Sequence, residues 1–202
     1  MKLYYTPGAC SLAPHIVLCE SQLPYQLERV DLRNKTIADG RDFLAINPLG
    51  YVPVLELSNG EILTENSAIL FYLADLVPAT RLVPPAGDVA RYRLLAWLNF
   101  IGSELHKNFS PLFAKTTPVE YRQLVEEKLA SRFAHVDGVL AFTPYLSGDH
   151  FSIADAYLFV VSNWAVVVGF DISGFTHLQA FRERVLARPS VQRAMKEEGL
   201  AG

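Results

Sequence analysis

Residues 47–69, NPLGYVPVLELSNGEILTENSAI, combine a strand that begins at a proline, a tight turn and the start of a helix. The apolar run of residues 52–57 predicts a strand, and Pro53 stands at its beginning, where a missing backbone N–H is tolerated. We predict a cis bond between Val52 and Pro53, which turns the N–H and C=O of Val52 outward. The Asn-Gly pair that follows predicts a two-residue hairpin turn into a second strand.

A helix is expected directly after this hairpin. Residues 64–67, Thr-Glu-Asn-Ser, precede a segment from Ala68 to Leu76 in which apolar residues recur at helical spacing. The first backbone N–H groups of a helix have no partner inside it, so we expect them to face whatever lies above the sheet edge. This end of a helix favours an anion.

The N-terminal segment places a cysteine at the start of another helix. Residues 1–5 predict a strand, residues 6–9 a turn, and the apolar spacing from Ser11 onward a helix. Cys10 therefore stands where the helix dipole and unpaired N–H groups favour a thiolate. The alternative is that Cys10 is a small buried residue without chemistry, and position alone does not decide between the two.

The order of the predicted elements divides the chain in two. Residues 1–77 alternate strand and helix signals as βαβαββα, which is a thioredoxin-like order. Residues 78–88 contain three prolines and a glycine and predict a linker. Residues 89–202 predict helices only. Within them, residues 156–170 are uncharged but shorter than the ~20 residues of a membrane span, so we expect a helix buried on all sides.

Composition narrows the class of protein. The chain has 202 residues, 50% of them hydrophobic, which is enough for two small cores. A net charge of −3 argues against a nucleic-acid-binding stripe and a polybasic membrane patch, because both signs are dispersed. The two cysteines lie in no CxxC or zinc spacing and no signal peptide precedes the first strand, so a cytoplasmic protein is expected. The scattered histidines also lack metal-ligand spacing, and we predict no metal site.

The first long helix of the second half carries two stripes. An apolar face, spaced by three and four residues, comprises Leu94, Leu98, Ile101, Leu105, Phe109 and Leu112. A polar stripe comprises Asn99, Ser103, His106 and Ser110. A polar stripe is usually solvated, but His106 beside Lys107 could instead face a cleft. Farther along, Ser152 and Asp155 predict an N-capping box for the buried helix, a role in folding.

These motifs together resemble the glutathione transferases, and within them the bacterial beta class. The matching segments are MKLYYTPGACSLAPHI, DFLAINPLGYVPVL, LTENSAI, YLADL, WLNFIGSELHKNFSPLF, GDHFSIADAYLF and ARPSVQRAMKEEGL. Each is weak alone, but several in order at the family's spacing are specific. The resemblance implies a thioredoxin-like domain followed by an all-α domain. It also implies a homodimer that binds a small apolar electrophile in a cleft against the helical domain.

The resemblance further implies glutathione as co-substrate and assigns site residues. Cys10 and His106 take the catalytic positions, with His106 near the glutathione sulfur. In the glutathione site, the backbone of Val52 pairs with the cysteinyl part, and Lys35 meets the glycyl carboxylate. Glu65 and the N–H of Asn66 hold the γ-glutamyl end. Ser103 and Glu104 reach the γ-glutamyl group from the partner subunit. Relatives typically show Gly or Ser where this chain has Asn66, so its side chain adds a contact or crowds the site.

The implied function is conjugation of the glutathione thiolate to apolar electrophiles. One alternative is a glutathione-dependent thiol-disulfide oxidoreductase in which Cys10 forms a mixed disulfide. Another is a non-catalytic binding or regulatory protein on the same scaffold, although the retention of Cys10, Lys35, Glu65 and His106 argues against it. We predict a depressed pKa for Cys10. Cys19 lies two turns farther along the helix among apolar residues, and we predict no depressed pKa for it.

Overall fold

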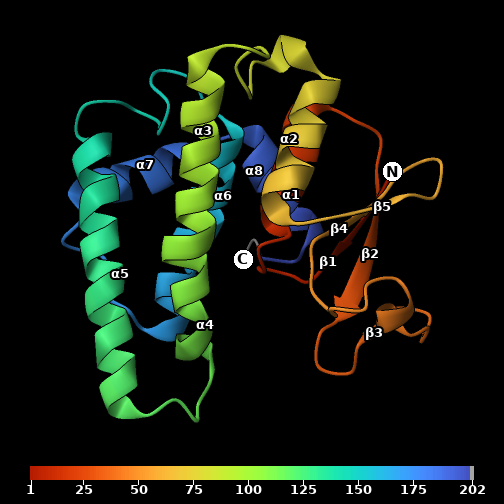
Figure 1. Cartoon of the computed structure of the whole chain (residues 1–202), viewed down its shortest axis with the longest axis horizontal. Coiled ribbons are helices and arrows are strands. Elements are labelled where there is room, and N and C mark those ends of the chain that lie inside the picture. The colour runs from red at the N-terminus through yellow and green to blue at the C-terminus, as the bar shows by residue number, and fades with distance from the viewer. Residues whose placement is uncertain (201–202) are drawn as a thin grey trace. The chain divides into compact units, whose positions relative to one another are not determined.

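The computed structural model describes residues 1–200, and these form two compact units (Figure 1). The N-terminal unit comprises Met1–Thr80 and the chain from Ala187 onward, and the helical unit comprises Arg81–Leu186. The break between them falls inside the predicted linker. Residues 89–202 were all predicted to belong to the helical domain, whereas residues 187–200 belong to the N-terminal unit in the structure.

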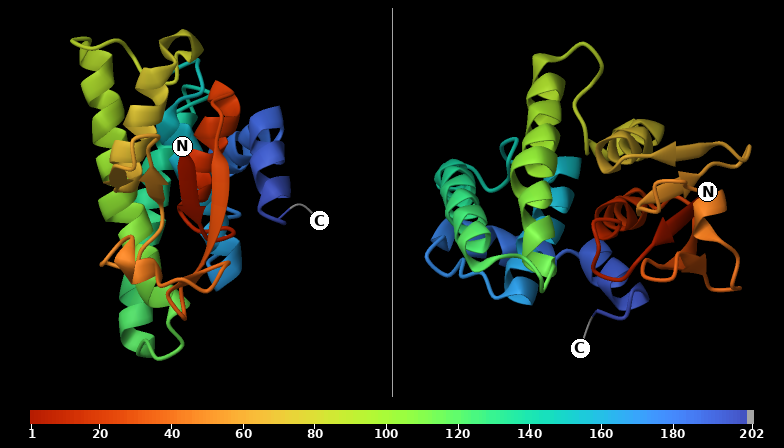
Figure 2. Two further views of the ribbon diagram at one scale, coloured as in Figure 1. Left: turned by 90° about the vertical axis from the view of Figure 1, so that its right-hand side faces the viewer. Right: turned by 60° about the horizontal axis from the view of Figure 1, so that its bottom comes forward.

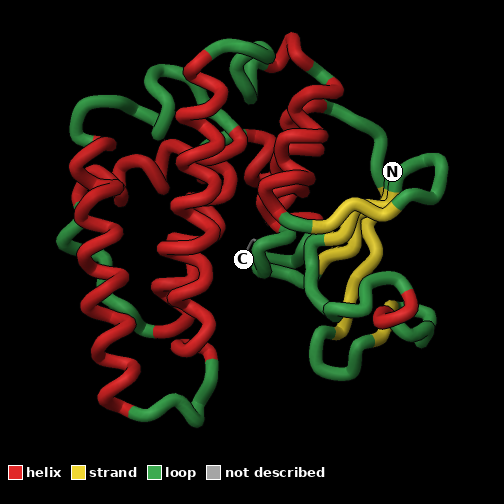
Figure 3. The backbone as a smooth tube through the Cα atoms, viewed as in Figure 1, coloured by secondary structure: helices red, strands yellow, loops and turns green. Residues whose placement is uncertain are grey.

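The N-terminal unit is built on a five-stranded mixed sheet (Figure 3). Its strands are β1 (Lys2–Tyr5), β2 (Gln26–Asp31), β3 (Thr36–Ile37), β4 (Val54–Glu56) and β5 (Ile62–Thr64), in the order β3-β2-β1-β4-β5. The β1–β2 pair is parallel and the others are antiparallel. The predicted fold class is confirmed. The pattern missed β3 because two residues are too few to show an alternation of apolar and polar positions.

The predicted hairpin between β4 and β5 is present, but its turn is longer than expected. Leu57 N–H donates to Glu61 C=O at 2.8 Å, and Gly60 N–H donates to Leu57 C=O at 3.0 Å. Three residues, 58–60, therefore separate the last bonded pair instead of two. Gly60 has a φ of 85°, the left-handed conformation that closes a type I turn followed by a bulge.

Three helices accompany the sheet, namely α1 (Leu12–Ser21), α2 (Asn66–Leu76) and α8 (Pro189–Glu197). Helix α1 packs against both α2 and α8 and is buried along almost its whole length (Figure 2). A separate cluster of buried side chains includes Tyr4, Val30 and Val54 from the strands and Phe43 from the short 3₁₀ helix η1 (Phe43–Ala45). A second 3₁₀ helix, η2 (Pro78–Thr80), follows α2.

Polar contacts explain why α8 belongs with the first unit. Glu20 at the end of α1 accepts hydrogen bonds from Arg188 and Ser190 at the start of α8. Glu198, just after α8, accepts from Gly8 N–H at 3.0 Å. The partners are 168 to 190 residues apart in the chain, so no local pattern could pair them.

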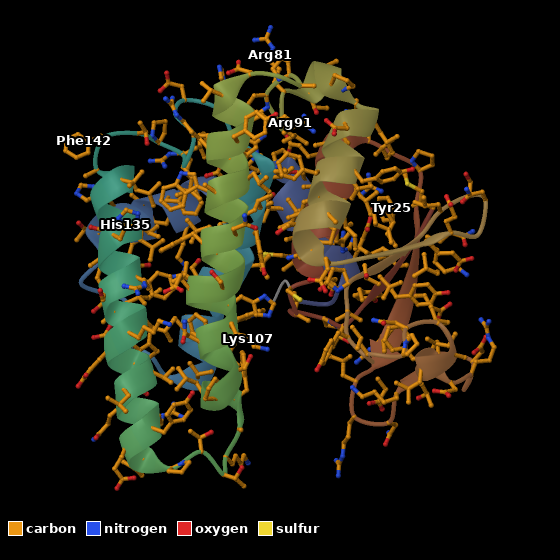
Figure 4. The ribbon with its side chains drawn as sticks, in the orientation of Figure 1. Tyr25, Arg81, Arg91, Lys107, His135 and Phe142 are labelled. Carbon is orange, nitrogen blue, oxygen red and sulfur yellow. The ribbon has the colours of Figure 1, made fainter. Side chains whose placement is uncertain are left out.

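The helical unit contains α3 (Val89–Phe100), a π-helix η3 (Ile101–His106), α4 (Lys107–Phe113), α5 (Val119–Leu140), α6 (Ile153–Val168) and α7 (Thr176–Leu186). The predicted apolar face from Leu94 to Leu112 is buried throughout. His135 of α5, labelled in Figure 4, stacks on Trp97 at a ring-centroid distance of 5.6 Å, so this histidine serves packing.

The helix predicted to be buried on all sides over residues 156–170 is α6, and the prediction holds only in part. The first ten residues of α6 are all buried, whereas Val166 and Val167 near its end are 70% and 71% exposed. The predicted capping box of Ser152 and Asp155 is formed. Asp155 also accepts from Leu146 N–H at 2.9 Å, which ties the preceding loop to the helix. Within residues 1–200, no helix combines the length and apolar character needed to cross a membrane.

Candidate active site

The register of the sheet gathers three predicted site segments at one end. Tyr4 pairs with Val54, and Val54 pairs with Thr64, so these residues form one row across the sheet. The loop after β1, the loop before β4 and the residues after β5 all leave the sheet from this row. Because β1 runs antiparallel to β4 and β4 runs antiparallel to β5, the segments that carry Cys10, Val52 and Glu65 lie at the same end of the sheet.

Cys10 lies in the turn before α1 and contacts the Val52 loop directly. Its side chain is 8% exposed, and the Sγ–H donates to the carbonyl oxygen of Val52 at 3.2 Å. Burial raises the pKa of the Cys10 thiol to about 12, and the backbone N–H groups of Cys10 and Ser11 only partly offset this effect. The predicted depressed pKa of Cys10 is therefore wrong, because desolvation outweighs the helix start. Cys10 is a protonated hydrogen-bond donor at neutral pH.

The loop that carries Val52 is held by two side chains. The Asn47 Nδ2 donates to Tyr51 C=O at 2.9 Å and its Oδ1 accepts from Leu49 N–H, while the Lys35 Nζ donates to Gly50 C=O at 2.9 Å. Lys35 thus lies beside the Val52 loop although it follows a different strand. The predicted cis bond between Val52 and Pro53 is confirmed. Asn47 was not predicted as a site residue, although its place before Pro48 and Gly50 is typical of a side chain that caps a turn.

The N-terminus of α2 combines backbone strain with an unpartnered side chain. Glu65 has a φ of 70°, a conformation that non-glycine residues rarely adopt and that clusters at ligand sites. Asn66, the first residue of α2, is 7% exposed, and within the described chain neither its Nδ2 nor its Oδ1 has a hydrogen-bond partner. A buried amide in this state calls for a ligand or water as its partner. An anion at this helix end therefore stays a prediction, and the buried amide of Asn66 is the observation that favours a ligand there.

Ser103, Glu104 and His106 share the π-helix of the helical unit. The sequence predicted one continuous α-helix here, and the structure has wider turns over six residues instead. The pattern did not reveal this because the buried positions Ile101, Leu105 and Phe109 are four residues apart, a spacing that fits both kinds of helix. Short π-helical stretches inside α-helices occur frequently at functional sites.

His106 is held by two aromatic residues of α6. Its Nδ1 lies 2.6 Å from the hydroxyl oxygen of Tyr157, and its ring meets that of Trp164 edge-on at a centroid distance of 4.7 Å. Burial, with the charge of neighbouring Lys107 (Figure 4), lowers the pKa of His106 to about 4. The imidazole is therefore neutral at pH 7. The sequence analysis did not connect Tyr157 with His106, because the two residues are 51 positions apart.

Glu104 and Ser103 have partners within the helical unit. The Glu104 carboxylate accepts from the Arg132 Nε at 2.7 Å and lies 3.6 Å from the Lys128 Nζ. The hydrogen bond from Arg132 lowers the pKa of Glu104, so this carboxylate is ionised at neutral pH. The exposed Ser103 donates from Oγ to Asn99 C=O at 2.9 Å. Of the predicted residues, the structure thus gathers Cys10, Lys35, Val52, Glu65 and Asn66 in one unit and places Ser103, Glu104 and His106 in the other.

Comparison with known proteins identifies the family. The chain matches the family model of the glutathione S-transferase N-terminal domain over residues 8–76 and that of the C-terminal domain over residues 100–189. It is 46% identical over 200 residues to glutathione S-transferase GstA of Escherichia coli O157:H7, covering 99% of this chain and 100% of that relative. The chain belongs to the glutathione S-transferase family.

Solved structures of this family superpose closely on the chain. A sphingomonad glutathione S-transferase complexed with glutathione has a TM-score of 0.96 at 46% identity, covering 100% of both chains. The bacterial beta class glutathione S-transferase of Sphingomonas chungbukensis also has a TM-score of 0.96, at 44% identity and 100% coverage of both chains. The resemblance drawn from the sequence motifs is therefore confirmed.

Proposed function

We propose that this glutathione transferase binds glutathione at the sheet end formed by Cys10, Val52 and the start of α2, and conjugates it to small apolar electrophiles. The observation that carries the proposal is the buried, unpartnered amide of Asn66 at the N-terminus of α2, beside the strained Glu65. A peptide with an anionic γ-glutamyl end satisfies both that amide and the free N–H groups of the helix.

The proposed binding mode uses the same sheet end. The cysteinyl part of glutathione adds to the Val52 backbone as a short strand, a mode of recognition in which main-chain hydrogen bonds give affinity. The carbonyl oxygen of Val52 has a second lone pair besides the one that accepts from Cys10. The Lys35 ammonium, beside the same loop, meets the glycyl carboxylate.

The protonation states favour conjugation over thiol-disulfide exchange by Cys10. In conjugation the glutathione thiol gives its proton to solvent, and its sulfur forms a bond to an electrophilic carbon as the leaving group departs. Neutral His106 can donate a ring N–H to the glutathione thiolate and stabilise it, and the Cys10 thiol can do the same when its S–H turns from the Val52 carbonyl to the glutathione sulfur. Exchange by Cys10 needs its own thiolate, and the pKa of about 12 disfavours that form.

The proposed assembly is a homodimer in the cytoplasm. Ser103 and Glu104 then complete the partner subunit's γ-glutamyl site, where the ionised Glu104 attracts the α-ammonium group. The two unpaired cysteines, Cys10 and Cys19, support a reducing compartment.

Parallel assays with a chloronitroaromatic acceptor and a low-molecular-weight disulfide test the proposal. Wild type should catalyse thioether formation, and Cys10→Ala should keep much of that activity while losing any disulfide exchange. His106→Ala should lower conjugation at least tenfold, as expected for loss of one positioned donor. Exchange without conjugation would establish the oxidoreductase alternative, and binding of glutathione without either reaction would establish the non-catalytic one.

A further inference from the structure

A cluster of potential metal ligands lies where α1 meets α8, apart from the proposed glutathione contacts. His15 is fully buried and Cys19 is 6% exposed, and both project from α1 at a spacing of four residues, which places them on one helix face. Glu197 comes from α8 with a side chain 31% exposed. One atom of each, an imidazole nitrogen, the Sγ and a carboxylate oxygen, lie within 4.8 Å of one another.

Neighbouring groups orient these three ligands. The His15 Nδ1 lies 2.9 Å from the Glu198 Oε1, and both side chains have no solvent exposure. The Nε2 therefore points toward Glu197, with 2.9 Å to its Oε2. A carboxylate that accepts from the second nitrogen of a ligating histidine fixes its ring and its tautomer, as in many zinc sites.

Tyr25 closes the fourth side of the cluster. Its hydroxyl donates to the Glu197 Oε2 at 2.6 Å and lies 3.1 Å from the Cys19 Sγ. Its side chain is labelled in Figure 4. The second carboxylate oxygen of Glu197 accepts from the Arg193 Nε at 2.8 Å, which leaves Oε2 facing the cluster. Solvent reaches the cluster along the partly exposed Glu197.

We propose that His15 Nε2, Cys19 Sγ and Glu197 Oε2 bind a divalent cation of the zinc type, with Glu198 as the orienting carboxylate and Tyr25 or a water in the fourth position. Nitrogen, thiolate and carboxylate together are a donor set that Zn²⁺ prefers, and hard cations such as Mg²⁺ do not take thiolate ligands. Tetrahedral Zn²⁺ holds such donors about 3.3–3.6 Å apart, so small rotations of the three side chains suffice.

Binding exchanges protons for the cation. A ligating imidazole nitrogen must be unprotonated and a ligating cysteine must be a thiolate, so binding of the cation releases to solvent any proton that His15 Nε2 or Cys19 Sγ holds. The cation would then join α1 to α8 directly, and it would stabilise the folded chain by mass action.

This site was not predicted from the sequence. The prediction of no metal site rested on the spacing between histidines, and no two of the five histidines have the sequence spacing of a metal site. The signal that was present is His15 followed by Cys19, one helical turn apart. Glu197 could not be added from the pattern, because it lies 182 residues from His15.

Titration of chelator-treated protein with Co²⁺ tests the proposal, because a cobalt–thiolate bond gives a charge-transfer band in the near ultraviolet. Wild type should show this band saturating at one equivalent per chain, and Cys19→Ala should lack it. Cys10→Ala is the matched cysteine control and His150→Gln the exposed-histidine control, and both should keep the band. Glu198→Gln should weaken Co²⁺ binding roughly 10–100-fold.

Thermal unfolding with Zn²⁺ gives an independent readout. Zn²⁺ should raise the unfolding midpoint of wild type and of Cys10→Ala, but not of Cys19→Ala, whose circular dichroism spectrum must match that of wild type. Cys19→Ser serves in its place if Cys19→Ala does not fold. A band that is absent in wild type, or that follows Cys10 instead of Cys19, would overturn the proposal.

Discussion

Alkylation of Cys10 over a range of pH gives a quantitative test of its environment. The pKa of Cys10 rises from an ordinary value of 9.0 to about 12 because the thiol is buried. The thiolate would also lose the hydrogen bond that the thiol donates to Val52 C=O. At any pH below 9 the thiolate fraction should therefore be roughly 10³-fold lower than in the unfolded chain.

Intrinsic reactivity offsets part of this loss. A thiolate of higher pKa is a better nucleophile, and a Brønsted coefficient of about 0.4–0.5 over three pKa units returns roughly 15–30-fold. The net expectation is that Cys10 in the folded protein reacts about 30–60-fold more slowly than in the unfolded chain, before any slowing by limited access.

The assay uses Cys19→Ala, so that Cys10 is the one thiol present. Iodoacetamide labelling is followed by mass spectrometry between pH 6.5 and pH 10, for the folded protein and for the same variant in urea. The folded rate should still be rising at pH 10. Labelling as fast as in urea at pH 7, or a plateau below pH 9, would refute the burial argument and restore the depressed pKa expected from the helix start.

Four further predictions concern other residues. His106→Ala should lower the turnover number at least tenfold while circular dichroism shows the variant folded at the assay temperature, and a loss of activity matched by the fraction unfolded would make His106 structural. Because the pKa of His106 falls from 6.5 to about 4, this residue binds fewer protons in the folded state than in the unfolded state, so the stability that His106 contributes is full above pH 6.5 and is lost as the pH falls toward 4. Urea unfolding at pH 7 and pH 4 should show that this residue accounts for up to about 3 kcal/mol of the fall in unfolding free energy in wild type, a contribution that His106→Phe lacks. Parallel curves of unfolding free energy against pH for the two proteins would contradict the prediction. Asp155→Ala should cost about 3–5 kcal/mol in urea unfolding, since two buried N–H groups lose their acceptor, and a cost under 1 kcal/mol would show that the capping box is dispensable. Glu104→Ala should raise the dissociation constant of glutathione about tenfold by calorimetry. Mixing this variant with Glu65→Ala should restore wild-type affinity at one of the two sites of each heterodimer. No restoration would show that the site is not shared between subunits.

Local patterns predicted most of the N-terminal unit. The predicted strand at residues 52–57 is present after Pro53 but is shorter, Val54–Glu56. The turn at Gly60 was predictable because Gly favours the left-handed conformation found there, and the helix start at Asn66 because polar residues precede an apolar helical spacing. The turn length was not, because a two-residue and a three-residue hairpin use the same Asn-Gly signal. Asn47, which holds the Val52 loop, looked like an ordinary turn residue.

The features that were not predicted from the sequence depend on contacts between residues far apart in the chain. Residues from Ala187 onward pack on α1 through Glu20 and Glu198, and neither contact leaves a local periodicity. The pKa of Cys10 depends on how deeply the fold buries the thiol, and a helix start in the sequence carries no information on depth. His106 likewise owes its setting to Tyr157 and Trp164 of α6.

Backbone amide chemical shifts recorded during titration with glutathione test the central claim most directly. The account predicts that the largest shifts fall on Val52, Glu65 and Asn66, and that they saturate together with one dissociation constant. The depression lined by Arg29, Asp31 and Thr36 at the C-terminal end of β2 is the internal comparison. Shifts that cluster at that depression, with Val52 and Asn66 unchanged, would contradict the proposed glutathione site.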